Sequence, residues 1–284
     1  MSDVEPQSMT ISLFGSDTSY WVYNPKRTQT IFMIHGFRGN HVGLRYVITG
    51  LSQYRIIIPD LPGFGASSPM TSKNHGISGY SDFAREFLLQ LGLNKPVLLG
   101  HSFGTIIAAH LAAEDPDLFA ELILINPISV SPRKGLIKGA TTGLVQAYYW
   151  LGTNLPESWS QRVLKSRTFN RIMSLSLSRT KDPALRRLVY AHHLRDLDYV
   201  QHKQVIAEAF EASITKTALD DAARIAKKTL LIAGQDDPIV PARTQKTLHK
   251  KIEDSQLILI PQVGHLIHLE TPESASRAIT DFLN

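Results

Sequence analysis

Short, near-continuous apolar runs recur along this chain of 284 residues and alternate with segments of helical periodicity. Runs of four to six mostly apolar residues are typical of strands that are buried on both faces of a parallel sheet. Strands and helices in alternation predict an α/β fold with helices on both faces of a parallel sheet. The runs that we predict to be such strands lie at residues 30–34, 54–59, 96–99, 122–126, 229–233 and 256–260.

Further elements fill the intervals between these runs. Residues 10–14 and 20–23 read as two short strands joined in a hairpin. Helices are predicted over 44–51, over 81–91 with Ser81 as the N-cap and Gly92 after its end, over 105–113, and over 272–283 at the end of the chain.

The strand pattern stops between residues 128 and 224. Only helical segments are predicted there, at 143–151, 157–174, 183–194 and 199–217, before the strands resume at residue 229. An all-helical insertion between two strands of one sheet predicts a lid over the ends of that sheet. We therefore expect one core domain formed by residues 1–127 and 225–284, with residues 128–224 as an inserted helical cap.

The formal net charge of +5 is concentrated in this predicted cap, which holds 15 Lys and Arg against 8 Asp and Glu. The cap sequence has no block of consecutive basic residues and no interleaved aromatic residues of the kind that nucleic-acid sites use. We therefore expect a solvated surface and no nucleic-acid partner. An attraction for anionic substrates or lipid head groups stays open, and the sequence does not indicate an oligomeric state.

Three absences in the sequence narrow the chemistry and the compartment. The chain has no cysteine, which excludes disulfides, thiolate catalysis and cysteine-ligated metals. It has no apolar run of 18 residues, so no transmembrane segment is expected. Residues 1–7 lack the basic flank and apolar core of a secretory signal, so the expected location is cytoplasmic.

The pentapeptide Gly100-His101-Ser102-Phe103-Gly104 lies between a predicted strand and a predicted helix. A Gly-x-Ser-x-Gly sequence in this setting is typical of a nucleophile elbow, a sharp turn that exposes the serine hydroxyl beside a helix N-terminus. The alternative is a tight strand–helix turn in which Ser102 is only an N-cap.

A serine nucleophile needs a general base and a carboxylate that orients this base. His265 is our candidate base because it follows the last predicted strand, and His268 is its main rival. Asp237 is our candidate carboxylate, since it stands three residues after Gly234 beyond the preceding strand, whereas the adjacent Asp236 would cap the turn or face solvent.

Negative charge that develops on a carbonyl oxygen is stabilised by preorganised N–H donors. The backbone N–H groups of Phe103, directly after the serine, and of Phe37, after the strand at 30–34, are the candidate donors. The sequence His35-Gly36 before Phe37 can also be read as a simple turn at the end of the strand.

Taken together, these motifs resemble the α/β-hydrolase superfamily over essentially the whole chain. The resemblance rests on His35-Gly36, the segment 60–67 (DLPGFGAS), the elbow, Gly234-x-x-Asp237 and Gly264-His265, in the order serine, aspartate, histidine. It implies a three-layer fold with an eight-stranded, mostly parallel sheet, and a cap after the sixth strand. It also implies a Ser102–His265–Asp237 triad that needs no cofactor and no metal.

The resemblance predicts a serine hydrolase of the capped esterase or lipase type, acting on a small-molecule ester with a small or medium apolar acyl group. Alternatives are a hydrolase of carbon–carbon bonds, a cofactor-free haloperoxidase or perhydrolase, and a ligand-binding protein without activity. Carbon–carbon hydrolases of ring-cleavage products typically have Trp after the catalytic histidine, where this chain has Leu266. Thr105 after the elbow also departs from the common Gly.

The substrate pocket is the least defined part of the prediction. The apolar stretch 144–151 is a candidate wall, with Tyr148 and Trp150 as its candidate contacts. The alternative, which is favoured for any single residue of the stretch, is an amphipathic helix that packs onto the core. His35, Gly36 and Leu266 are further candidate substrate contacts because they flank the predicted catalytic groups.

Overall fold

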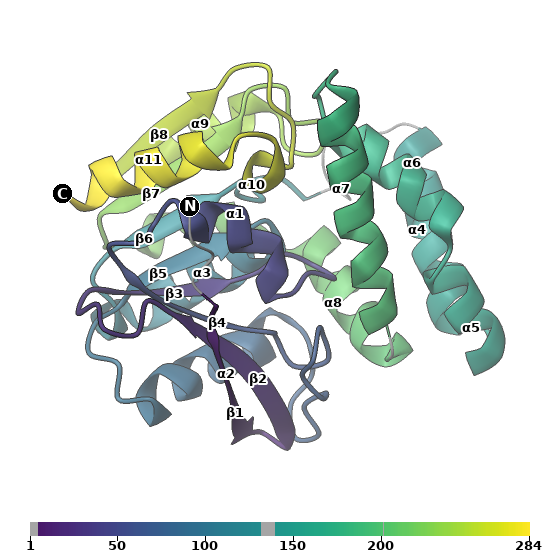
Figure 1. The fold of residues 1–284 in the computed structure, drawn as a ribbon, viewed down its shortest axis with the longest axis horizontal. Coiled ribbons are helices and arrows are strands. Elements are labelled where there is room, and N and C mark those ends of the chain that lie inside the picture. The colour runs from purple at the N-terminus through teal and green to yellow at the C-terminus, as the bar shows by residue number, and fades with distance from the viewer. Residues whose placement is uncertain (1–4, 132–139, 201) are drawn as a thin grey trace.

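The computed structural model describes residues 5–131, 140–200 and 202–284. In this part of the chain, eight strands form one sheet in the order β1-β2-β4-β3-β5-β6-β7-β8 (Figure 1). Along this order, each pair of neighbours in β4-β3-β5-β6-β7-β8 is parallel, whereas β2 is antiparallel to both β1 and β4. The predicted α/β fold with a mostly parallel eight-stranded sheet is confirmed. The strands are β1 (Gln7–Leu13), β2 (Ser16–Tyr23), β3 (Thr30–Ile34), β4 (Arg55–Pro59), β5 (Val97–His101), β6 (Leu122–Ile125), β7 (Thr229–Gly234) and β8 (Ser255–Ile260).

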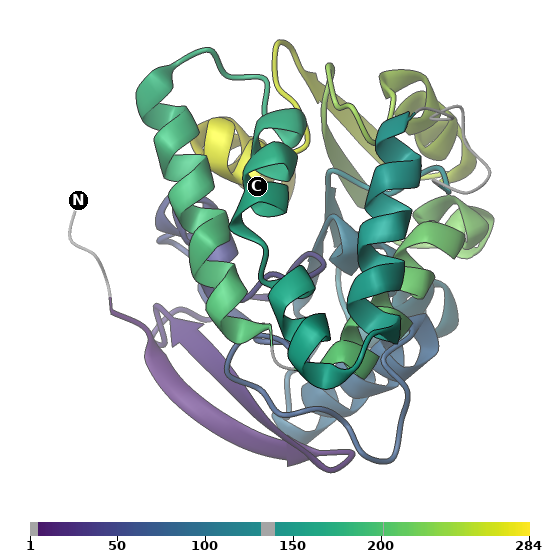
Figure 2. The same cartoon turned by 90° about the vertical axis from the view of Figure 1, so that its right-hand side faces the viewer.

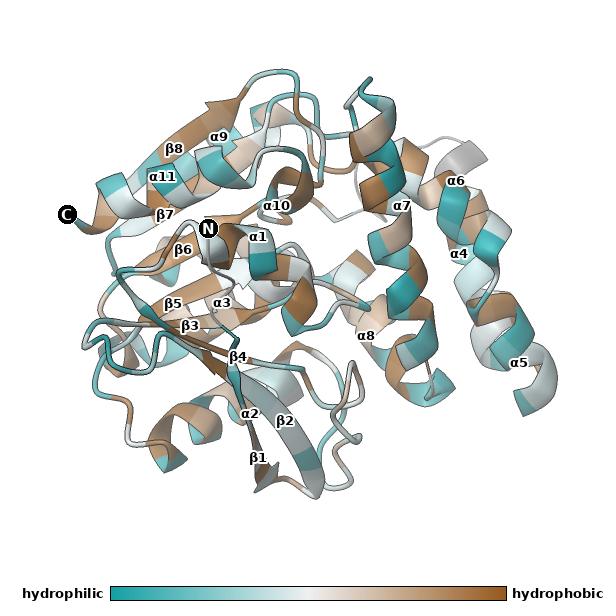
Figure 3. Cartoon of the chain, viewed as in Figure 1, coloured by the Kyte–Doolittle hydropathy of each residue, from teal (hydrophilic) through white to brown (hydrophobic). Residues whose placement is uncertain are grey.

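The central strands consist mostly of hydrophobic residues (Figure 3), as expected where helices cover both sides of a sheet. Alternate residues of β3 enter different cores: Phe32 and Ile34 pack on one face, and Ile31 and Met33 pack on the other. The first face is covered by α2 (Ile77–Gln90), α3 (Phe103–Glu114) and α9 (Ala242–Lys251), and the second by α1 (Arg45–Thr49) and α11 (Pro272–Leu283).

Between β6 and β7, the longer elements that the structure describes are the helices α4 to α8, and these helices lie together beside the sheet (Figures 1 and 2). We call α4 to α8 the cap helices because they fall within the predicted cap. Carboxylate contacts join α8 and the connection between α6 and α7 to the rest of the chain: Glu208 of α8 accepts the N–H of His75, and Glu270 accepts the N–H groups of Arg179 and Thr180. The cap helices are α4 (Ala140–Asn154), α5 (Glu157–Leu164), α6 (Arg167–Leu177), α7 (Pro183–Asp196) and α8 (Lys203–Thr215).

Short elements complete the chain. A four-residue helix, α10 (Ile267–Glu270), precedes α11. Single turns of 3-10 helix occur at η1 (His41–Leu44), η2 (Pro116–Leu118), η3 (Leu197–Tyr199), η4 (Ala218–Asp220) and η5 (Ala222–Arg224).

Two predicted helix boundaries are wrong. The helix predicted from Ser81 begins at Ile77 with Gly76 as its N-cap, and Ser81 is buried inside it. The helix predicted over 157–174 is interrupted after Leu164, because the Ser166 side chain accepts the Phe169 N–H and so caps a new helix.

Some sequence predictions fall on residues outside the description. These are residues 132–139 and 201 of the predicted cap, and residues 1–4 of the segment read for a secretory signal. Among the described residues, no helix combines the length and the apolar character needed to cross a bilayer.

Candidate active site

The backbone at Ser102 has the sharp conformation expected of a nucleophile elbow. Ser102 lies between β5 and α3 with φ 51° and ψ −116°, a region that L-residues rarely adopt. Chain segments pass close by on both sides: a Cβ at Gly100 would lie 2.4 Å from the Gly104 carbonyl O, and one at Gly104 would lie 2.3 Å from that of Ile34. These two glycines therefore allow a turn that no larger residue permits.

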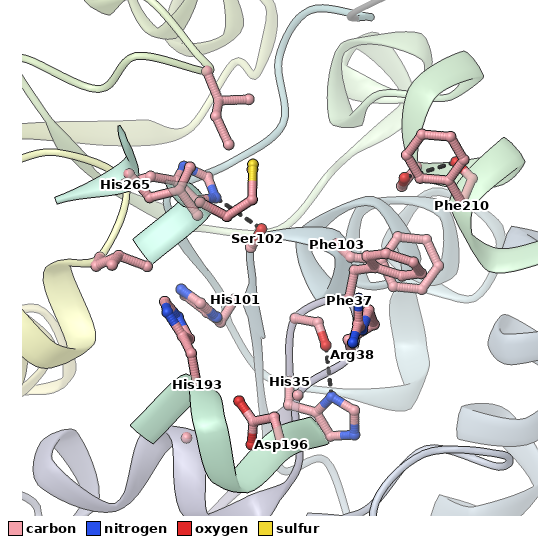
Figure 4. Close-up of a pocket in the computed structure, with 18 of the residues that line it drawn as sticks. His35, Phe37, Arg38, His101, Ser102, Phe103, His193, Asp196, Phe210 and His265 are labelled. Carbon is pink, nitrogen blue, oxygen red and sulfur yellow. Dashed lines mark hydrogen bonds between the residues drawn. The ribbon is translucent and has the colours of Figure 1, made fainter. Parts of the chain in front are cut away.

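Three side chains from separate strand ends form one hydrogen-bonded chain. Ser102 Oγ lies 2.9 Å from Nε2 of His265, which follows β8 (Figure 4). The Nδ1 of His265 lies 2.7 Å from Oδ2 of Asp237, which follows β7. His265 and Asp237 are both buried. With Nδ1 protonated and bonded to the carboxylate, Nε2 is free to accept the proton of Ser102.

The environment of Asp237 holds its carboxylate in the ionised form. Its Oδ1 accepts the N–H groups of Ile239 at 2.7 Å and Val240 at 3.1 Å. Burial acts to raise the pKa of Asp237, but the adjacent His265 and the two N–H donors outweigh it, and the pKa is lowered. The neighbouring Asp236 is exposed.

The rival histidine does not reach the serine. His268 is buried, and its Nδ1 has no hydrogen-bond partner among the described residues. Its ring stacks edge-on against His101, with the ring centroids 4.1 Å apart. Only His265, of these two candidates, bonds to both Ser102 and a carboxylate.

The two candidate oxyanion donors lie in the wall of the same cavity as Ser102. Phe103 is the first residue of α3, so its N–H has no acceptor within that helix. Phe37 lies in the loop after β3. Within the described residues, neither backbone N–H donates to another protein group. Both N–H groups are therefore free to bind a substrate oxygen.

His35 orders the loop that carries Phe37. Its Nε2 accepts the Leu61 N–H at 2.8 Å, which assigns the ring proton to Nδ1, 2.8 Å from the Gly36 carbonyl O. Burial lowers the pKa of His35, so the ring stays neutral in this arrangement.

Thr105, the departure from the common Gly, connects the elbow to the segment after β6. Its side chain is fully buried, donates to the Ser102 carbonyl O and accepts the Ile128 N–H at 3.1 Å. The Thr105 hydroxyl therefore bonds to two backbone groups, the Ser102 carbonyl and the Ile128 N–H, that a Gly at this position could not reach with a side chain.

The cavity beside Ser102 has a volume of about 390 Å³ and lies between the strand ends and the cap helices. One side of it is aromatic, and we call this set the aromatic wall: Phe37, Phe103, Tyr149, Phe169 and Phe210. Another side is polar, and we call it the polar wall: His101, His192, His193, Asp196 and His268. Figure 4 shows Phe37, Phe103 and Phe210 on one side of Ser102, with His101, His193 and Asp196 on another.

The predicted substrate contacts are only partly in this cavity. His35, Gly36 and Leu266 line it. Trp150 is 64% exposed and does not line it, so that prediction is wrong. Tyr148 is also absent from the wall, because its ring stacks on Phe169 and its hydroxyl donates to the Leu164 carbonyl O at 2.8 Å.

Sequence reasoning missed most of the pocket. Tyr149 lies between Tyr148 and Trp150, the two predicted contacts, and its ring lines the cavity and stacks on Phe210. No pocket role is predicted from the sequence for His192 or His193, and His268 is predicted only as the rival base. The adjacent His192-His193 pair was the one available signal, but only the fold brings it near Ser102.

No group of three or more metal-ligating side chains in the described ranges is arranged to hold a metal ion. The arrangement around Ser102 brings a serine hydroxyl, an imidazole, a carboxylate and two N–H donors together at a cavity. Acyl transfer by a serine nucleophile needs this set of groups.

Comparison with known proteins places this geometry in a family. A family model described as the alpha/beta hydrolase fold matches residues 29–272. The chain belongs to the α/β-hydrolase family. The resemblance inferred from the sequence motifs is thereby confirmed.

Three relatives illustrate the range of this family. An uncharacterized hydrolase of Bacillus subtilis is 27% identical over 276 residues, covering 95% of each chain. Lipase 1 of Psychrobacter immobilis is 25% identical over 281 residues, covering 95% of this α/β hydrolase and 81% of the lipase. A 2-hydroxy-6-oxo-2,4-heptadienoate hydrolase of Pseudomonas putida is 26% identical over 241 residues, covering 84% and 82%. By family and by these relatives, the protein is a hydrolase.

Proposed function

We propose that this α/β hydrolase cleaves carboxylic esters with small or medium apolar acyl groups through an acyl-enzyme. The observation that carries the proposal is the hydrogen-bonded chain Ser102–His265–Asp237 beside a cavity with two free backbone N–H groups. The similarity to a lipase supports ester substrates, and the aromatic wall supports an apolar acyl group.

The proposed reaction uses each of these groups in turn. His265 Nε2 takes the proton of Ser102 as Oγ attacks the ester carbonyl, and the N–H groups of Phe37 and Phe103 stabilise the oxyanion. His265 then gives the proton to the leaving alcohol, and later activates the water that hydrolyses the acyl-enzyme. Asp237 holds the imidazole in the required tautomer and stabilises its cation.

We further propose that residues 128–224 act as a cap on a core formed by residues 1–127 and 225–284. Cap helices supply much of the cavity wall, through residues such as Tyr149, Phe169, His193 and Phe210. A cap that lines the cavity would select the substrate, while the strand ends carry the chemistry.

The test is the substitution Ser102→Ala, assayed on p-nitrophenyl butyrate. The variant should stay folded, by circular dichroism, and lose the hydrolysis that the unaltered protein shows. Hydrolysis at the full rate in a folded Ser102→Ala variant would overturn the mechanism.

A second candidate is hydrolysis of a carbon–carbon bond by the same groups, which the similarity to the heptadienoate hydrolase favours. A vinylogous diketone substrate separates the two functions. The ester proposal predicts faster turnover of p-nitrophenyl butyrate than of the diketone, and the reverse order would favour carbon–carbon hydrolysis.

A further inference from the structure

The polar wall has no role in the ester chemistry proposed above. Its five side chains come from three parts of the chain: His101 ends β5, His268 belongs to α10, and the other three belong to α7. All five line the cavity that contains Ser102. A set of four histidines and one aspartate gathered at one side of a mostly apolar cavity needs an explanation.

Among the polar-wall histidines, His193 has unused hydrogen-bonding capacity beside the cavity. Its Nδ1 is held by a 2.6 Å hydrogen bond with Ser174 Oγ, and its Nε2 makes no hydrogen bond within the described ranges. Nε2 of His101 and Nδ1 of His268 also find no partner in the described residues, but both atoms are fully buried, so a ligand in the cavity would not reach them. Polar groups that leave water are normally paired, so a bound molecule with its own donor or acceptor would stabilise His193.

The histidines of the wall favour an uncharged partner. The guanidinium of Arg38, which lines the same cavity, is already bonded to Leu164, Tyr148 and Tyr149. Burial and neighbouring histidines lower the pKa of His101 and His268, the former to about 3. Burial also lowers the pKa of His193 to about 3 and that of His192 to about 4. A neutral imidazole offers one donor and one acceptor, which suits a hydroxyl group, whereas an unpaired ion is costly to bury here.

The carboxylate of Asp196 adds a hydrogen-bond acceptor to the polar wall. Its Oδ1 accepts a hydrogen bond of 2.9 Å from Asn40 Nδ2. The side chain keeps some accessible area because it faces the cavity. Asp196 can therefore accept a further hydrogen bond from a ligand hydroxyl.

The location of the wall indicates which half of an ester would contact it. The general acid must reach the leaving oxygen, so the leaving alcohol lies beside His265. The ring centroid of His101 is 6.4 Å from that of His265, and His101 in turn packs on His268. The aromatic wall includes the two oxyanion donors, with the rings of Phe37 and Phe103 6.2 Å apart.

We propose that the polar wall binds the alcohol half of the substrate, and that this half is uncharged and carries hydroxyl groups, as in a glyceryl monoester. The acyl chain then lies along the aromatic wall. This inference rests on the proposed serine-hydrolase function and extends it to the class of alcohol.

The first experiment compares three butyrate esters of similar size: glyceryl monobutyrate, propyl butyrate and carboxymethyl butyrate. They share the acyl group and differ in the alcohol, which carries two hydroxyls, none, or an ionised carboxylate. We expect kcat/KM for the glyceryl ester to exceed that for the propyl ester by about tenfold or more. The carboxymethyl ester should be the poorest of the three, because its anion meets neutral rings.

The second experiment measures the same glyceryl-to-propyl ratio in variants. His193→Phe should reduce the ratio to about one, and His193→Gln, which keeps a donor and an acceptor, should restore part of it. His249→Gln is the matched control, since His249 bonds to Ser255 outside the cavity, and its ratio should equal that of the unaltered protein. If His193→Phe does not fold, Asp196→Leu replaces it with the same expected loss.

The outcomes separate this inference from the function on which it rests. Equal kcat/KM values for the glyceryl and propyl esters would overturn the assignment of the polar wall and leave the serine hydrolase intact. A ratio that His193→Phe leaves unchanged would do the same. A protein that hydrolyses none of these esters nor p-nitrophenyl butyrate would overturn the proposed function itself, and this inference with it.

Discussion

Nη2 of Arg38 donates a hydrogen bond of 3.0 Å to the carbonyl O of Leu164, so the loop after β3 is hydrogen-bonded to the cap helix α5. Nη1 of the same guanidinium lies 3.4 Å from Tyr148 Oη and 3.3 Å from Tyr149 Oη. Arg38 adopts φ 57° and directly follows Phe37, a candidate oxyanion donor. The position of that donor is thus coupled to the packing of α4 and α5.

Arg38→Lys tests this coupling. A lysine keeps the charge but lacks the planar fork that reaches three acceptors at once, so the Phe37 N–H should shift from its place. We expect kcat on p-nitrophenyl butyrate to fall about tenfold or more, because small misplacements of catalytic groups are costly. Arg27→Lys is the control, since Arg27 bonds to the Ser52 carbonyl O at an exposed site. Equal kcat values for the two variants would contradict the coupling.

Asp237→Asn tests the orienting carboxylate against its neighbour. An amide that holds His265 in the wrong tautomer should lower kcat by a factor on the order of 10⁴. Asp236→Asn is the matched control, because Asp236 is exposed and its side chain is outside the hydrogen-bonded chain. Steady-state kinetics should show the control within about twofold of the unaltered protein. Similar losses in both variants would refute the assignment of Asp237.

The elbow glycine can be tested by stability rather than by activity. In Gly104→Ala the new methyl group would meet backbone, 2.3 Å from the Ile34 carbonyl O, which no side-chain rotation relieves. We expect the free energy of unfolding in urea to fall by about 3 kcal/mol. Gly143→Ala, in α4, meets no atom within 4 Å and should raise it by up to about 1 kcal/mol. A Gly104→Ala variant as stable as the unaltered protein would contradict the close approach.

Asp196 predicts a pH dependence of stability. Burial raises the pKa of Asp196 from its ordinary value of 3.8 to about 7. The folded state therefore binds the proton more tightly than the unfolded state, and this contribution is lost as the pH rises from about 4 to about 7. Relative to Asp196→Asn, the free energy of unfolding should fall by roughly 2–4 kcal/mol over that range. Parallel stability curves for the two proteins would contradict the raised pKa.

The sheet was predictable because burial on both faces leaves nearly every strand residue apolar, as in β3 and β7. The candidate catalytic residues were predictable for a related reason. Parallel strands end at one edge of the sheet, so Ser102, Asp237 and His265, each after its own strand, had to lie near one another.

The pocket was not predictable because it depends on how the cap helices pack. Consecutive residues of a helix point about 100° apart, so Tyr149 can face the cavity while Trp150 is 64% exposed. Apolar residues occur around much of α4, and Leu144 and Leu151 are also exposed. The hydropathy pattern therefore did not identify the buried face. Likewise, His192 and His193 gain their position only from the packing of α7 over the strand ends.

Labelling with a fluorophosphonate tests the central claim most directly, since this reagent requires an activated serine rather than any particular ester. Peptide mapping by mass spectrometry should find the adduct on Ser102 in the unaltered protein. His265→Gln, which removes the base, should reduce the labelling rate by a factor on the order of 10³ or more. No adduct on Ser102, or labelling at the same rate in His265→Gln, would contradict the account.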